Sequence, residues 1–226
     1  MGLGATVKRM ASRITPWAAV VSGRTDAPFS VALTFDDGPH PENTPSILDT
    51  LDTHAARATF FLQGDMASHQ IALVREIVSR GHQIGNHGHA HRDARAVSTK
   101  EYVADVLRCQ SVLEDIVGRE LPRNFRPPFG HVAAGSTIAL LRRKFRFVFW
   151  SLDSCDSFLP DSRALVKHVT SQRISAGSIL LFHDDNAHTT EALPQLVAHL
   201  EKLLLRMVSL DELLSDGARG PAGRSP

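Results

Sequence analysis

The sequence predicts a single α/β domain in which about seven parallel strands form a distorted (β/α) barrel. Short runs rich in Val, Ile, Leu and Phe alternate along the chain with longer segments whose apolar residues recur at helical spacing. Several of the short runs are apolar throughout, as expected of strands that are covered on both faces. This alternation fits a closed or nearly closed barrel and also an open, doubly wound sheet. No glycine-rich phosphate loop follows the first strand, which counts against a nucleotide-binding open sheet.

The expected strands are short and bounded by turn-forming or polar residues. They are Ser30–Phe35, Ala58–Leu62, His82–Asn86, Asn124–Arg126, Arg146–Ser151, Ser178–His183 and Arg206–Leu210. Each is rich in residues that favour strands, and helical patterns separate them.

Helices are expected between these strands. One begins with a capping box at Ser98–Glu101 and ends at Gly118, where glycine favours a helix C-terminus. Another begins with Thr44 as N-cap and Pro45 at the first helical position. Further helices are expected at Ile71–Val78, Ser136–Lys144, Ser162–Arg173 and Thr190–Leu205.

The expected domain covers residues 29–214. An N-terminal arm or helix, residues 1–28, precedes it, and a Gly/Pro/Arg-rich tail, residues 215–226, follows and is expected to be disordered. The apolar stretch Trp17–Val21 is too short for a signal-peptide core. No stretch reaches the ~18 apolar residues of a membrane span. We therefore expect no membrane span and favour a cytoplasmic location over export.

The composition gives no reason to expect a nucleic-acid partner. Lys and Arg number 25 and Asp and Glu 24, which leaves a formal net charge of +1. Cys109 and Cys155 are the only cysteines, and we expect two free thiols rather than a disulfide framework. The chain has 12 histidines, and several of them cluster.

Polar residues cluster where the expected strands end. The clusters are Asp36–Asp37, Asn86–His91, Arg126–Gly130, Asp153–Asp156 and His183–Asp185. In parallel α/β barrels the C-terminal ends of the strands carry the active site. The pattern therefore predicts one active site built from successive strand ends.

These residue types suit a catalytic metal. Two imidazoles from His87, His89 and His91, together with one carboxylate, leave an open coordination position, as in catalytic zinc sites. A metal there lowers the pKa of bound water and polarises a carbonyl. The second aspartate of the Asp36–Asp37 pair could then accept a proton, and a histidine opposite could protonate the leaving group.

Each cluster taken alone has a simpler interpretation. Asp36–Pro39 could be only a turn, His87–His91 a surface histidine run, and His183 a core histidine. Arg126 and Asp156 could form a structural ion pair. Their joint occurrence at successive strand ends favours a catalytic site over all of these.

From about Phe29 to Leu214 the chain resembles polysaccharide deacetylases of the nodulation-protein type, carbohydrate esterase family 4. All five family motifs have a counterpart in the family's order. The resemblance implies a distorted (β/α) barrel and a divalent metal, and an activity that removes N-acetyl or O-acetyl groups from sugars.

The first two motifs imply the metal site. In "TFDDGP", residues 34–39, the resemblance makes Asp36 the general base. The implied metal ligands are Asp37, His87 and His91. His89, inside the second motif "HGHAH", ranks below the other two histidines as a ligand. Gly88 stands where the family has Ser or Thr, so a hydroxyl that supports the loop is lost.

The third and fifth motifs imply further catalytic groups. In "RPPFG", Arg126 orients the base, and Phe129 replaces the usual Tyr but keeps the backbone N–H that stabilises the oxyanion. In "LFHD", Leu181 forms a pocket wall and His183 is the general acid.

The fourth motif departs from the family at one position. Asp156 is retained, and it is expected to pair with Arg126 or to tune the acid histidine. Ser157 stands where the family has Trp, whose indole helps to wall the acyl methyl. Phe158 or Trp150 could compensate for that loss.

The predicted function is a metal-dependent deacetylase that hydrolyses the N-acetyl group of an N-acetylated sugar or polysaccharide. Zinc is the expected metal, and cobalt, nickel or manganese would also suit the ligands. The change to Ser157 motivates an alternative, a hydrolase of another amide such as a formamide, an imide or a cyclic amide. A second alternative is a degenerate member that only binds glycan.

Overall fold

The computed structural model describes residues 20–24 and 29–215. Residues 1–19 of the expected N-terminal arm lie outside the described residues. The tail expected to be disordered also lies outside them, apart from Ser215, which ends a helix.

Parallel strands form one sheet at the centre of the described chain. They are β1 Val20–Val21, β2 Ser30–Asp36, β3 Ala58–Leu62, β4 Gln83–Asn86, β5 Asn124–Phe125, β6 Arg146–Val148, β7 Leu152–Asp153, β8 Ile179–His183 and β9 Arg206–Met207. The order is β1-β6-β5-β4-β3-β2-β8-β7, and β9 pairs with β2 outside this path. All pairings between these strands are parallel, which confirms the prediction.

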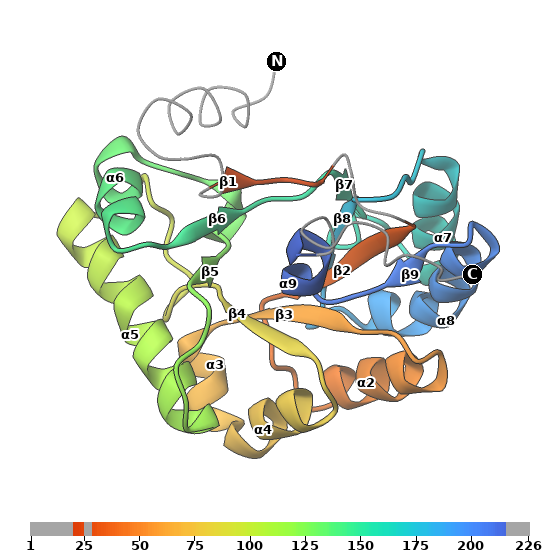
Figure 1. Ribbon diagram of the computed structural model, residues 1–226, viewed down its shortest axis with the longest axis horizontal. Coiled ribbons are helices and arrows are strands. Elements are labelled where there is room, and N and C mark those ends of the chain that lie inside the picture. Colours follow the sequence, from red (N-terminus) through yellow and green to blue (C-terminus); the bar gives the residue numbers. More distant parts are fainter. Residues whose placement is uncertain (1–19, 25–28, 216–226) are drawn as a thin grey trace, which may run out of the picture.

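The sheet is curled into an incomplete barrel with the helices around it (Figure 1). Strands β6 and β7 lie near opposite ends of the strand order, yet only residues 149–151 connect them. Such a short link requires the two ends of the sheet to lie close together. A bridge between Gly23 and Ser178 also joins the two ends. The distorted barrel, not the open doubly wound sheet, is therefore the observed fold.

Most predicted strands agree with the structure to within one residue at each end. The larger differences lie at β6 and β9 and at the two-residue strands β1 and β7, which the sequence did not predict. The expected strand Arg146–Ser151 ends at Val148, and the chain then crosses to β7 at the other end of the sheet. The expected strand Arg206–Leu210 ends at Met207, and Leu210 instead begins a helix. Val20–Val21 forms an edge strand against β6, so the sheet begins before residue 29.

The helices lie between the strands, as expected. They are α2 Asn43–Thr53, α3 Gly64–His69, α4 Ile71–Ser79, α5 Thr99–Val117, α6 Ala134–Arg142, α7 Ser162–Ser171, α8 Ala187–Lys202 and α9 Leu210–Ser215, with a short 3₁₀ turn, η1, at Pro128–Gly130. The capping box of α5 is present, and Gly118 ends that helix with a φ of 75°. The sequence did not predict α3 and α9, whose six residues each are too few to show a helical period.

The predicted N-cap of α2 is wrong. That helix begins at Asn43, after Glu42, so Thr44 lies inside its first turn. The Thr44 hydroxyl donates instead to Asp184 Oδ2, at 2.7 Å. The side chain that was expected to cap the helix thus bonds a residue far away in the sequence.

Successive side chains of β2 point to opposite faces of the sheet, one toward the surrounding helices and the other toward the inside of the barrel. Leu33 and Phe35 pack on the outer face of the sheet under the helices. A smaller inner cluster, which includes Ala32 and Phe61, is closed by Leu210 of α9. Thr34 and Asp36 point to the same inner side as Ala32. Pairing with β8 places Asp36 directly beside His183, so the sheet register alone brings these two residues together.

Candidate active site

Asp37, His87 and His91 form a group that can hold a metal ion. Their potential ligand atoms all lie within 4.8 Å of one another. Asp37 Oδ1 is 3.1 Å from His91 Nε2 and 3.5 Å from His87 Nε2. Asp37 follows β2, and the two histidines follow β4, two strands away in the curled sheet. No other group of this kind occurs within residues 20–24 and 29–215.

Hydrogen bonds orient the members of this group. His87 Nδ1 lies 2.7 Å from the carbonyl oxygen of Arg126, and because a carbonyl can only accept, Nδ1 carries the proton. His87 Nε2 is therefore the ring nitrogen left to bind a cation. Gln63 Nε2 donates to Asp37 Oδ1 at 2.8 Å. Gln63 is not part of any of the sequence motifs, although it follows β3 directly and so stands at a strand end like the predicted site residues.

The group fits a divalent metal of the zinc type. Four ligands placed tetrahedrally about 2.1 Å from an ion are separated from each other by about 3.4 Å. The 3.1 and 3.5 Å separations around Asp37 Oδ1 match that spacing. Burial and the neighbouring His87 both lower the pKa of His91, which favours the neutral imidazole that a metal requires.

His89 does not belong to this group. Its side chain is buried against Gly64, where a Cβ atom would lie 2.5 Å from His89 Nδ1. The histidine that ranked lowest as a ligand is thus a packed side chain in the structure.

Asp36 is held by Arg126, which is completely buried. Arg126 Nη1 donates to Asp36 Oδ1 at 2.7 Å and to Thr34 Oγ1 at 2.8 Å. The guanidinium also lies 4.2 Å from the centre of the Phe61 ring. Asp36 Oδ2 lies 3.8 Å from His87 Nε2. One carboxylate oxygen is therefore fixed by Arg126 while the other faces the metal group.

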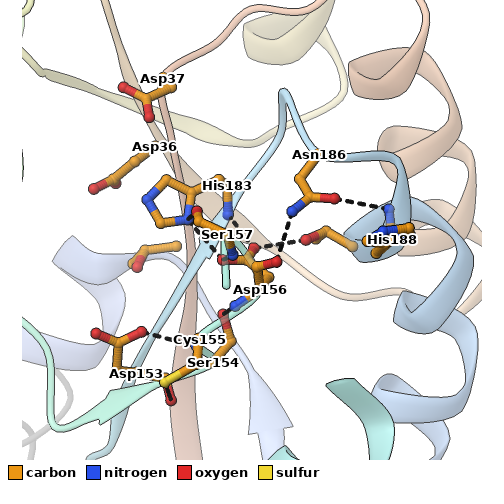
Figure 2. Close-up of polar contacts among 12 residues, drawn as sticks. Asp36, Asp37, Asp153, Ser154, Cys155, Asp156, Ser157, His183, Asn186 and His188 are labelled. Carbon is orange, nitrogen blue, oxygen red and sulfur yellow. Dashed lines mark hydrogen bonds and ion pairs between the residues drawn. The ribbon is translucent and has the colours of Figure 1, made fainter. Parts of the chain in front are cut away.

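Asp156 pairs with His183, not with Arg126. The distance from Asp156 Oδ1 to His183 Nδ1 is 2.7 Å, and Asp156 Oδ2 accepts the backbone N–H of His183 at 2.7 Å. Thr189 Oγ1 also donates to Oδ2, at 2.6 Å. Figure 2 shows the His183 ring between this carboxylate and the Asp36–Asp37 pair. Of the two roles expected for Asp156, the geometry supports tuning of the acid histidine, not pairing with Arg126.

This pairing favours the protonated imidazole. Burial alone would lower the pKa of His183, but the hydrogen bond and the charge of Asp156 outweigh burial and raise it to about 9. Burial would raise the pKa of Asp156, but its bonds to His183 and Thr189 hold it below the ordinary value. At neutral pH the pair is imidazolium and carboxylate, so His183 has a proton to give.

The side chains expected around the acyl group differ in how far they are buried. Leu181 is buried two residues before His183, on the same face of β8. Ser157 Oγ lies 3.2 Å from His183 Nδ1. Phe158, at 87% exposed, does not replace the missing indole as a packed wall. Trp150 is packed instead: a Cβ at Gly130 would lie 3.0 Å from its ring.

Phe129 lies over the metal group. It has a φ of 59°, and its ring centre is 4.5 Å from that of His91, while the side chain is 59% exposed. The role expected for its backbone N–H, a donor to the oxyanion, stays a prediction.

Asp184 is a second residue that the sequence analysis left without a role. Its side chain is fully buried, Oδ1 has no hydrogen-bond partner, and burial raises its pKa to about 8. A Cβ atom at position 38 would overlap this carboxyl group, so only glycine fits there. Asp184 and Gly38 thereby set the path of the chain directly after Asp37.

Comparison with known proteins decides the family. The model of the polysaccharide deacetylase family matches residues 23–147, more than half of the chain. The chain belongs to the polysaccharide deacetylase family. This membership confirms the family and the enzyme class that the sequence motifs predict, a hydrolase of N-acetyl amide bonds. It also implies a divalent metal, for which the Asp37–His87–His91 group is available.

Two of the similar proteins represent the activities named among the relatives. A peptidoglycan-N-acetylglucosamine deacetylase of Bacillus cereus is 34% identical over 189 residues, which cover 81% of this chain and 87% of the relative. A chitooligosaccharide deacetylase of Bradyrhizobium is 35% identical over 155 residues, which cover 69% of this chain and 70% of the relative.

Solved structures share the fold. The crystal structure of the Bc1960 peptidoglycan N-acetylglucosamine deacetylase matches with a TM-score of 0.80 and 30% identity over 92% of this chain and 95% of that one. BA3943 of Bacillus anthracis, described as a carbohydrate esterase family 4 pseudoenzyme, matches with a TM-score of 0.81 and 25% identity over 89% of this chain and 70% of that one. The same fold thus occurs in an enzyme and in a protein described as a pseudoenzyme, so the fold alone does not carry the chemistry.

No helix within the described residues is long and apolar enough to cross a membrane.

Proposed function

We propose that this protein is a zinc-dependent deacetylase that removes the acetyl group from N-acetylglucosamine residues of a glycan. The observation that supports this best is a carboxylate, Asp36, that is fixed by Arg126, lies 3.8 Å from His87 of the metal group and pairs in the sheet register with the protonated His183. The activities named for the relatives support the choice of substrate class.

Asp37, His87 and His91 would hold the metal. When bound, the ion polarises the acetamide carbonyl and makes the attacking water more acidic. Two imidazoles and one carboxylate suit zinc, and the same set would also accept cobalt, nickel or manganese.

The geometry of two side chains supports the proposed proton transfers. Asp36, held by Arg126, accepts a proton from the water that attacks the carbonyl carbon. His183 then donates its proton to the sugar nitrogen as the C–N bond breaks, so that acetate and a free amine leave. The Phe129 N–H donates to the oxyanion, and Leu181 contacts the acetyl methyl.

Hydrolysis of another amide is a second candidate. Ser157 is small, and no packed aromatic ring stands at its position or at Phe158. A wider acyl site would admit a formyl group or a cyclic imide as readily as an acetyl group. A glycan-binding protein without activity is the third candidate, and the complete set of acid, base and metal-binding residues argues against it.

A substrate panel separates the three candidates. We expect the zinc-loaded protein to release acetate from an N-acetylated chitooligosaccharide, and to turn over its N-formyl analogue and a small cyclic imide more slowly. Acetate, formate and ring-opened product would be measured, with Asp36→Asn protein as the control for contaminating activity. Faster turnover of the imide or formamide would favour the second candidate. Absence of turnover by zinc-bearing protein would favour the third.

A further inference from the structure

The loop that carries two metal-binding histidines is held by a carboxylate from α5. Asp105 Oδ2 accepts the backbone N–H of His89 at 2.7 Å, and Asp105 Oδ1 accepts that of Ala90 at 3.2 Å. The preceding N–H, that of Gly88, donates to Asn86 Oδ1 at 2.9 Å. Asp105 is buried, so solvent competes weakly for these bonds. All three N–H groups between His87 and His91 thus have side-chain acceptors.

The carbonyl groups of the same loop are held from the other side. The backbone N–H groups of Gly64 and Asp65, at the start of α3, donate to Gly88 O and His89 O, both at 2.9 Å. The loop is therefore clamped between the first turn of α3 and a carboxylate of α5.

This clamp holds an unfavourable backbone conformation. His91 has a φ of 48°, in the left-handed region that a residue with a Cβ atom rarely adopts. Such a conformation is unfavourable and persists only where surrounding bonds enforce it. In this conformation His91 Nε2 lies 3.1 Å from Asp37 Oδ1, as the metal group requires.

Asp105 also accounts for the glycine at position 88. Gly88 has a φ of 80°, and a Cβ atom there would lie 3.0 Å from Asp105 Oδ2. A Ser or Thr, the residues usual in the motif, would crowd the carboxylate as well as strain the backbone. In this chain Asp105 of α5 supplies the acceptor that supports the loop. Its carboxylate occupies the space that a Ser or Thr side chain at position 88 would need.

We propose that Asp105 is a positioning residue of the metal site, whose carboxylate fixes the loop so that His87 and His91 present Nε2 to the same point. The inference rests on the metal site of the proposed function. Asp105 touches neither metal nor substrate, and it acts only through the backbone of His89 and Ala90. The Arg92 side chain lies beside the same carboxylate, with its Nε 3.4 Å from Asp105 Oδ1.

The test is zinc affinity, measured on metal-free protein by competition with a chromophoric chelator. We expect Asp105→Ala to weaken zinc binding by about 10–100-fold, the usual effect of losing a group that orients metal ligands. Asp105→Asn, whose amide oxygen can still accept one N–H, should lose less. Asp115→Ala is the matched control, because Asp115 is an exposed aspartate of the same helix. The zinc affinity of this variant should equal that of the wild type.

Thermal unfolding of the metal-free proteins separates positioning from simple stabilisation. If folded Asp105→Ala binds zinc as tightly as the wild type, even with a lowered Tm, the inference is overturned. If Asp105→Ala does not fold, Asp105→Asn decides: a weakened zinc affinity supports the inference, and an unchanged one overturns it. Failure of the wild-type protein to bind zinc would instead overturn the proposed function, so the two failures are distinguishable.

Discussion

Asp36→Asn should lose nearly all turnover yet bind zinc about as tightly as the wild type. The change removes the proton acceptor, and general-base catalysis typically contributes about 10²–10⁴-fold in rate. The asparagine oxygen can still accept from Arg126 Nη1, which now bonds Asp36 Oδ1 at 2.7 Å. The metal group Asp37–His87–His91 does not include Asp36, so its ligands stay in place.

Asp37→Asn is the matched variant, because the two residues are neighbours with the same side chain. It should weaken zinc binding itself, since Asp37 Oδ1 lies within 3.5 Å of both histidine nitrogens. Acetate release in a single turnover and zinc competition would be measured on both proteins. If Asp36→Asn loses zinc and Asp37→Asn retains it, the two roles are reversed.

His183→Ala should slow acetate release by about 10²–10⁴-fold at neutral pH, because the leaving amine loses its proton donor. In the wild type the acid works only while protonated, and the pKa of His183 is about 9. Activity should therefore fall as the pH rises through about 9. This basic limb of the pH profile should disappear in His183→Ala.

Asp156→Asn tests the cause of that limb. The Asp156 carboxylate raises the pKa of His183, so its removal should move the basic limb down toward the ordinary histidine value of 6.5. The pH dependence of kcat/KM would be measured for all three proteins. An unchanged basic limb in His183→Ala would exclude His183 as its source. A limb that stays near pH 9 in Asp156→Asn would exclude Asp156 as the cause of the shift.

Most of the fold can be predicted from the sequence because its long elements carry strong local signals. The all-apolar runs of β2, β3 and β8 and the capping box of α5 are examples. Short elements carry too little signal: β1 has two residues and α9 six, and each is fixed by neighbours far away in sequence. Thr44 shows the same effect, because its bond to Asp184, 140 residues away, overrides a good N-cap pattern.

The site could be predicted where function demands a particular residue type. Carboxylates and imidazoles at strand ends mark Asp36, Asp37, His87 and His91 directly. The residues that support them are harder to assign. Gln63 and Asp184 also follow strands, but their roles, like that of Asp105 in α5, come from contacts made only in the folded chain. Arg126 is a mixed case. The resemblance implies that Arg126 orients the base, and in the structure it bonds Asp36. The sequence left open whether Asp156 pairs with Arg126 or with His183, and only the folded chain shows the bond to His183.

A zinc titration of the metal-free protein, followed by acetate release from an N-acetylated chitooligosaccharide, tests the central claim most directly. Metal-free protein should be inactive, and activity should rise in proportion to added zinc and reach its maximum at one ion per chain. Asp37→Asn should need far more zinc, and Asp36→Asn should bind the ion without recovering activity. Full acetate release by the metal-free protein would contradict the account.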